Sequence, residues 1–197
     1  MNQLWLNRGD ICFLYKEVGS ISTSFIFINM NTDQIFEKSK QSARGMWILN
    51  KMLHRMIPFN KPHRLEVVKL DAEETIVQIP YYRKNLNHLK GIHACALITG
   101  AEYCSGLVLL QHLSPDKYRL IMKDLKVVYH YQAKMESTAK FGLAKNDLFQ
   151  TLGVEFEETG IGLISCHIPV YDEQKNLICD VTINWQIKDW QKVKTKV

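Results

Sequence analysis

Between Gly91 and Leu113 the chain carries an almost uninterrupted run of apolar residues, and this run limits the possible folds more than any other feature. We expect it to form one long helix. A helix that is apolar on all sides is stable in water only where other elements cover most of its surface. Glu102 stands near the middle of the run, which favours a core helix over a membrane-spanning one. The helix is therefore expected at the centre of the domain.

The segments on both sides of this helix have the patterns of β-strands. Two short strands, Arg64–Leu70 and Thr75–Tyr82, are predicted to form a hairpin before it. The segment Leu177–Lys188 alternates apolar and polar residues, as strands do in a sheet with one buried face. The other predicted elements are strands at Tyr118–Ala133, Thr138–Leu143 and Gly160–Tyr171, and a small helix at Asn146–Glu158. The fold class that follows is α+β, with an antiparallel sheet of about six strands wrapped around one long central helix.

The 197 residues have room for one sizeable domain with an extension. Loose helical spacing predicts an N-terminal helical segment over residues 30–60, with Gly45 as a candidate break and Pro58 and Pro62 at its end. The sheet and the central helix are assigned to residues 61–189, and residues 190–197 to a basic tail. Residues 1–29 are an uncertain extension, and one hypothesis is that the natural start is Met30.

The composition excludes several classes of protein. With 46% hydrophobic and 23% charged residues, the chain is expected to be an ordinary globular protein. Its net charge of +5 is dispersed, and the basic tail is typical of a solvated terminus, so no nucleic-acid partner is expected. Five cysteines without a C-x-x-C pair favour reduced thiols in a cytoplasmic protein. Signal, membrane-span, metal, dinucleotide and phosphate-loop patterns are missing from the sequence, so we expect neither a membrane nor a cofactor.

Glu102 is the residue that points most directly to chemistry. Its neighbours one helical turn away, Ile98, Thr99, Ser105 and Gly106, are apolar or small. A carboxyl group in such surroundings has lost much of its water, which raises its pKa. Two interpretations stay open. The carboxylate has a role in catalysis, or it is structural and pairs with a buried His or Tyr or reaches solvent at an interface.

A polar loop over residues 85–93 leads into the start of the same helix and contains Asn87, His88 and His93. Free backbone N–H groups and the positive end of the helix dipole lie at such a helix start. They can hold a carbonyl oxygen as it gains negative charge, in the manner of an oxyanion hole. Ordinary helix capping is the alternative interpretation of this loop.

The spacing in this segment resembles that of the hotdog-fold acyl-CoA thioesterases, in particular the phenylacetyl-CoA thioesterase-like branch. That branch carries Asn, then His-Gly-Gly six residues later at the start of the central helix, then Asp or Glu nine residues after the His. Here Asn87, His93-Ala94-Cys95 and Glu102 fall at those intervals. The predicted order of strands around one helix is also that of a hotdog domain. The resemblance covers about Lys61 to Asp189.

The resemblance implies hydrolysis of an acyl-CoA or acyl-carrier-protein thioester. Glu102 would act as general base or nucleophile, and Asn87 would orient water or the carbonyl. The oxyanion hole would be formed at His93 and Ala94. Further contacts to the substrate are expected from His88, Gly91, Thr99 and Ser105. Since this family usually builds each site across a subunit interface, a homodimer or a dimer of dimers is implied.

Two alternatives remain open. His88 stands fourteen residues before Glu102, the spacing found in 3-hydroxyacyl-thioester dehydratases of the same fold, although the Phe, Pro and Gly that follow their His are not matched here. Ala94-Cys95 replaces the Gly-Gly that allows close backbone approach to a thioester, as expected for a non-catalytic acyl-binding module. Lys90 and Lys134 are candidates to meet the phosphates of CoA.

Overall fold

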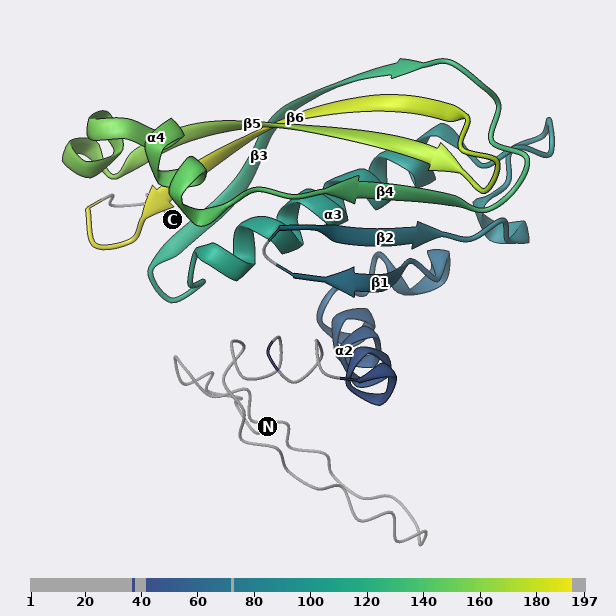
Figure 1. Ribbon diagram of the computed structural model, residues 1–197, viewed down its shortest axis with the longest axis horizontal. Coiled ribbons are helices and arrows are strands. Elements are labelled where there is room, and N and C mark those ends of the chain that lie inside the picture. Colours follow the sequence, from purple (N-terminus) through teal and green to yellow (C-terminus); the bar gives the residue numbers. More distant parts are fainter. Residues whose placement is uncertain (1–36, 38–41, 72, 193–197) are drawn as a thin grey trace, which may run out of the picture.

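The computed structural model describes residue 37, residues 42–71 and residues 73–192. Its antiparallel sheet has six strands in the order β1-β2-β4-β5-β6-β3 (Figure 1). The strands are β1 (Glu66–Leu70), β2 (Thr75–Ile79), β3 (Tyr118–Tyr129), β4 (Ser137–Phe141), β5 (Ile161–Asp172) and β6 (Leu177–Asp189). The helices are α2 (Ala43–Met56), α3 (Ala94–His112) and α4 (Lys145–Thr159), with 3-10 turns η1 (Lys61–His63) and η2 (Arg83–Asn85). The predicted α+β fold class is confirmed. The hypothesis about Met30 falls outside the described residues.

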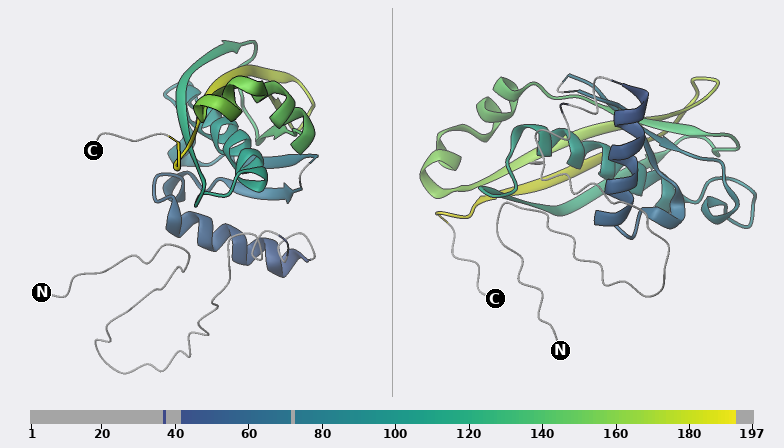
Figure 2. Two further views of the ribbon diagram at one scale, coloured as in Figure 1. Left: turned by 90° about the vertical axis from the view of Figure 1, so that its left-hand side faces the viewer. Right: turned by 90° about the horizontal axis from the view of Figure 1, so that it is seen from below.

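The sheet curls around α3, as the view on the left of Figure 2 shows. By length and composition α3 could cross a membrane, but more than half of it is buried inside the fold. Gly100 allows the closest contact with the sheet, because a Cβ atom at this position would lie 2.4 Å from the side chain of Ile79 on β2. The apolar run therefore forms the central core helix that the sequence predicts.

The alternation predicted for the last strand is confirmed along β6. Val181, Ile183 and Ile187 are fully buried on the side that faces α3, whereas Thr182 and Asn184 between them are partly exposed. Successive side chains of a strand point to opposite faces, so the inner face of the sheet and α3 together form the apolar core.

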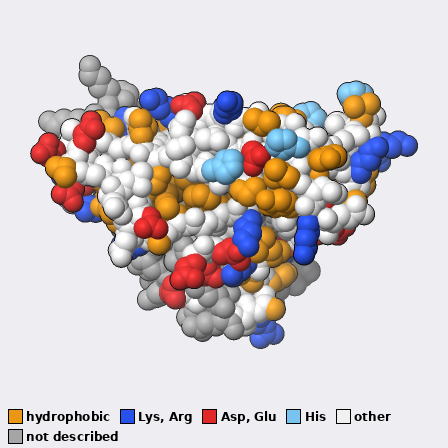
Figure 3. All heavy atoms as spheres, turned by 45° about the horizontal axis from the view of Figure 1, so that its top comes forward, with side chains coloured by type: hydrophobic (Ala, Val, Ile, Leu, Met, Phe, Trp, Pro, Cys, Tyr) orange, Lys and Arg blue, Asp and Glu red, His pale blue; other side chains and the backbone are white. Residues whose placement is uncertain are grey.

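The outer face of the sheet is mixed in character. Figure 3 shows hydrophobic side chains in orange among histidines in pale blue on this side of the molecule. Here the carboxylate of Asp180 contacts His130 Nε2 at 2.9 Å and His167 Nε2 at 3.2 Å. These groups stand on the solvent side of the sheet, away from α3 and from the predicted site.

Helix α2 runs through Gly45, so the break considered at this residue is wrong. Ser42 caps the helix, because its Oγ accepts a hydrogen bond from Gly45 N at 3.1 Å. Glycine costs a helix only about 1 kcal/mol relative to alanine. The cap and the burial of Leu49 and Leu53 offset this cost.

Side chains of α2 also close the outer edge of β1. The side chain of Asn50 pairs with the backbone of Val67: its Oδ1 accepts from the N–H at 2.8 Å, and its Nδ2 donates to the carbonyl oxygen at 2.9 Å. His54 Nε2 lies 2.7 Å from the carbonyl oxygen of Leu65. An edge strand normally presents such groups to solvent or to another chain. Here the protein satisfies them internally.

Strand β3 forms the opposite edge of the sheet, and it is long. It pairs with β6, and its other edge has no strand partner in the part of the chain that the structure describes. On its inner face Met122 and Tyr129 are 41% and 45% exposed. This edge therefore offers backbone groups and apolar side chains that the described residues leave uncovered.

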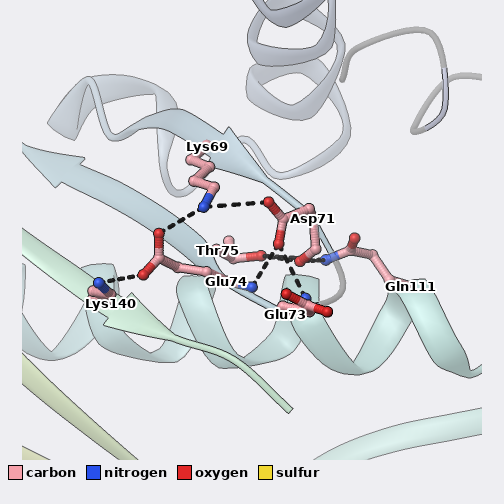
Figure 4. A network of polar contacts seen from close by, with 7 residues as sticks. All are labelled: Lys69, Asp71, Glu73, Glu74, Thr75, Gln111 and Lys140. Atoms are coloured by element: carbon pink, nitrogen blue, oxygen red, sulfur yellow. Dashed lines mark hydrogen bonds and ion pairs between the residues drawn. The ribbon is translucent and has the colours of Figure 1, made fainter. Parts of the chain in front are cut away.

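A polar network fastens the predicted hairpin of β1 and β2 to the far end of α3. Asp71 Oδ1 accepts hydrogen bonds from the N–H groups of Glu73 and Glu74 at 3.0 and 2.6 Å. Gln111 of α3 donates to the carbonyl oxygen of Asp71 at 3.2 Å. Figure 4 shows the whole network, which consists of Lys69, Asp71, Glu73, Glu74, Thr75, Gln111 and Lys140. The C-terminal end of α3 is thereby fixed against the sheet.

Candidate active site

His93 caps the start of α3 and leaves one backbone donor free. Its Nδ1 accepts a hydrogen bond from Cys95 N at 3.1 Å. An accepting Nδ1 carries no proton, so the neutral ring holds its proton on Nε2 and offers a donor there. Within the described residues, the N–H of Ala94 has no hydrogen-bond partner. Ala94 thus keeps the donor expected of an oxyanion hole, whereas the donor of Cys95 is used by the cap.

Asn85, which the sequence analysis missed, joins three segments at this helix start. It is only 1% exposed. Its Nδ2 donates to the carbonyl oxygens of His63 at 2.9 Å and Pro80 at 3.0 Å, and its Oδ1 lies 3.0 Å from His63 Nδ1. Its own carbonyl oxygen accepts from His93 N at 2.6 Å. No local pattern marks this role, because the partners come from distant parts of the sequence.

Asn87 organises the loop before α3. Its Oδ1 accepts from the N–H groups of Leu89 at 2.9 Å and Gly91 at 3.1 Å. The N–H of Asn87 donates to the carbonyl oxygen of Gly91 at 2.8 Å, which closes the loop. The side-chain oxygen is therefore occupied. Nδ2 has no partner within the described residues, and this is the end of the amide that can donate to a carbonyl oxygen.

Glu102 lies on a stripe of α3 that the sheet does not cover. The stripe consists of residues spaced four apart, all partly exposed: Ile98, Glu102, Gly106 and Leu110. Burial raises the pKa of the Glu102 carboxyl group. In the part of the chain that the structure describes, this carboxylate has no hydrogen-bond or ion-pair partner. The structural interpretation, in which it pairs with a buried His or Tyr, therefore has no such partner within these residues.

The two predicted halves of the site lie far apart on one helix. Ala94 and Glu102 are eight positions apart, and a rise of 1.5 Å per residue separates them by roughly 12 Å along the axis. A base and an oxyanion donor must both come within about 3 Å of the reacting group. A single chain therefore does not bring Glu102 and the N–H of Ala94 to the same carbonyl group.

A pocket of about 130 Å³ opens beside the start of α3. It lies between η1, η2 and the first turns of α3. Of the predicted site residues, His93 and Thr99 line it. Glu102 does not line it, and neither does His88, whose side chain is exposed in the loop.

Ser105 lies away from the pocket. It is fully buried, and its Oγ donates to the carbonyl oxygen of Glu102 at 3.0 Å and accepts from Trp185 Nε1 at 3.1 Å. The hydroxyl group joins α3 to β6. It has no access to the pocket.

The buried cysteines are poor candidates for a nucleophile. Burial raises the pKa of each of the thiols of Cys104, Cys166 and Cys179 to about 12, so they stay protonated at neutral pH. Cys95 is exposed beside the pocket. Among the described residues no group of three or more His, Cys, Asp or Glu side chains is suited to hold a metal ion.

Comparisons with known proteins define the fold. A family model described as "Domain of unknown function (DUF4442)" matches residues 45–187, and no curated protein matches the chain. A Pseudomonas aeruginosa protein described as a probable thioesterase has a TM-score of 0.66 and 22% identity, over 73% of this chain and 95% of that chain. A Haemophilus influenzae thioesterase has a TM-score of 0.57 and 12% identity, over 73% of this chain and 90% of that chain. A Chlorobaculum tepidum protein of unknown function has a TM-score of 0.63 and 16% identity, over 80% of this chain and 96% of that chain. The predicted hotdog fold is confirmed.

Proposed function

We infer that this chain, which belongs to the family described as Domain of unknown function (DUF4442), is a thioesterase that hydrolyses an acyl-CoA or acyl-carrier-protein thioester. The observation that carries the proposal is Glu102, a half-buried carboxyl group with raised pKa on the uncovered stripe of the central helix. The thioesterase descriptions of proteins with the same fold support it. We also propose a cytoplasmic location, which the free, buried thiols support.

The proposed reaction uses water as the nucleophile. The Glu102 carboxylate removes a proton from water while the oxygen attacks the thioester carbon. The N–H of Ala94 stabilises the negative charge that develops on the carbonyl oxygen, and Asn87 Nδ2 orients this oxygen. The tetrahedral intermediate then breaks its C–S bond, and the thiolate takes the proton from Glu102. A raised pKa makes the carboxylate a stronger base than an ordinary glutamate.

The active form is proposed to be a homodimer, alone or as half of a dimer of dimers. The roughly 12 Å between Ala94 and Glu102 on one helix means that each site needs Glu102 from one copy and Ala94 from the other. The uncovered stripe of α3 and the unpaired edge of β3 support this arrangement. A second copy related by a two-fold axis would present the same surface in return.

Release of free thiol from short-chain, long-chain and aryl thioesters tests the proposal. The wild-type chain is expected to hydrolyse at least one class, and Glu102→Gln is expected to lower kcat at least about 100-fold, because general-base catalysis contributes about that much or more. Glu158→Gln is the matched control, since Glu158 is an exposed glutamate on α4.

Three results would contradict the proposal. Full activity of Glu102→Gln would remove this residue from catalysis. Hydration of an enoyl thioester without release of thiol would identify a dehydratase. Binding of acyl thioesters without any turnover would identify the non-catalytic binding module.

A further inference from the structure

The pocket beside α3 is lined by one lysine and two histidines and by no acidic side chain. Lys84, His63 and His93 all line it, and neither Asp nor Glu contributes to its wall. The remaining wall includes the apolar side chains of Phe59, Leu86 and Ala96. No ion pair involves Lys84 within the described residues. A cationic side chain is thus left available at a pocket of about 130 Å³.

Hydrogen bonds fix how the two imidazole rings can contact a ligand. Both hydrogens of Asn85 Nδ2 are donated to carbonyl oxygens, so Asn85 Oδ1 is the acceptor and His63 Nδ1 the donor. In this tautomer Nε2 of His63 is an acceptor. His93 offers its Nε2–H already in the neutral form, because its Nδ1 accepts from Cys95. His93 can thus donate from Nε2 toward a negatively charged group.

The start of α3 adds to this potential. The first turn of a long helix carries a partial positive charge, and the N–H of Ala94 is unpaired within the described residues. The wall of the pocket, with Lys84 and two histidines from separate segments, is an observation independent of the helix start. The buried amide of Asn85 keeps these segments together.

We propose that this pocket binds an anionic group of the thioester substrate. The shared chemistry is a carboxylate or phosphate oxygen that accepts hydrogen bonds from Lys84 and from Nε2 of His93. The group is either a carboxylate at the end of a short acyl chain or a phosphate of the thiol carrier. That the anion belongs to a substrate rests on the proposed function, whereas binding of the anion does not depend on turnover.

Steady-state hydrolysis with paired substrates tests this proposal. Glutaryl-CoA and pentanoyl-CoA differ in a terminal carboxylate. Acyl-CoA carries phosphates, on a nucleotide and pantetheine arm, that the acyl thioester of N-acetylcysteamine lacks. Lys84→Gln is expected to raise KM at least about tenfold for the anionic member of one pair, with kcat and the KM of the neutral member within twofold of wild type. Lys126→Gln, at an exposed lysine on the outer side of β3, is expected to change neither constant.

The two pairs also distinguish the source of the charge. A loss confined to glutaryl-CoA against pentanoyl-CoA assigns the pocket to an acyl carboxylate. A loss for every CoA ester with none for N-acetylcysteamine esters assigns it to a carrier phosphate. Equal losses for CoA esters and N-acetylcysteamine esters of the same uncharged acyl group, or no loss for any substrate, would overturn the proposal.

A binding measurement separates this proposal from the proposed hydrolysis. Inorganic phosphate and glutarate are titrated into the full chain, and the side-chain NMR signals of His63 and His93 are followed. We expect shifts with one of these anions that weaken at least about tenfold in Lys84→Gln. Shifts without any thioester hydrolysis would reject the enzyme and keep the anion site. Hydrolysis without shifts would reject the anion site alone.

Discussion

The two edges of the sheet differ in how far other residues cover them. At β1 the side chains of Asn50 and His54 on α2 take up backbone groups of the edge strand. At β3, a strand of 12 residues, the outer edge has no partner strand among the described residues, and Met122 and Tyr129 beside it are largely exposed. Unprotected edges promote association. The homodimer proposed above would therefore use the β3 side of the sheet.

The largest effect is expected from placing charged side chains on the inner face of β3. The double substitution Met122→Lys with Tyr129→Lys places two cations in the proposed apolar contact, and burying unpaired charges there is costly. We expect a folded monomer whose hydrolysis falls at least about 100-fold, because the separated halves of the site lose their partner. Analytical ultracentrifugation and thiol release measure the two effects.

Val128→Lys is the control for this double variant, because Val128 is 46% exposed on the outer face of the same strand. It is expected to stay dimeric and active. A double variant that remains a fully active dimer would show that β3 is not the interface.

A smaller effect is expected from removing the side chain of α2 that bonds to the backbone of β1. Asn50→Leu leaves the N–H and carbonyl oxygen of Val67 without their partners. We expect the free energy of unfolding to fall by about 2 kcal/mol. Urea denaturation measures this fall. Activity per folded molecule should be retained, since no residue of α2 lines the pocket or has a role in the proposed reaction.

Arg44→Ala, at an exposed site near the start of α2, is the comparison for Asn50→Leu. It should change the free energy of unfolding by less than about 0.5 kcal/mol. An equal effect of both substitutions would mean that the covering of β1 contributes nothing specific to stability.

The smallest effect concerns Glu102 and the pH dependence of the free energy of unfolding. The pKa of Glu102 is raised by burial above its ordinary value of 4.5. The folded state therefore binds this proton more tightly than the unfolded state, so the contribution of Glu102 to stability falls as the pH rises from about 4.5 through the raised pKa. Relative to the wild type, Glu102→Gln should gain stability over that interval. Urea denaturation at a series of pH values measures the difference, and parallel curves would contradict it.

Local periodicity explains which parts of the fold could be predicted. The alternation in β6 and the apolar run of α3 are properties of single segments, and both are confirmed. The ends of elements depend on distant partners. The predicted helix starts at Gly91, but α3 starts at Ala94, because Ile92 N bonds to the carbonyl oxygen of Ala133 and His93 N to that of Asn85. Such long-range hydrogen bonds leave no trace in the local pattern.

The same reasoning applies to the candidate site. Glu102 stands out in the sequence because a charge interrupts an apolar run. The proposed roles of Glu102 and Asn87 remain predictions. The pocket could not be predicted, because its wall combines Phe59 and His63 from before the sheet with Lys84 and the first turns of α3. Asn85 escaped notice since an asparagine in a polar loop has nothing unusual about it.

Asn85 couples the leading segment of the chain to the first turn of the central helix. The side-chain amide of Asn85 bonds to the carbonyl oxygen and to Nδ1 of His63, and its backbone carbonyl oxygen accepts from His93 N. A displacement of the residues before β1 is thus expected to shift the start of α3, where Ala94 lies. A chain shortened to the sheet and the central helix would lack α2 and two residues that line the pocket, Phe59 and His63. The residues before β1 therefore help to hold the start of α3 in place, where the oxyanion hole is proposed.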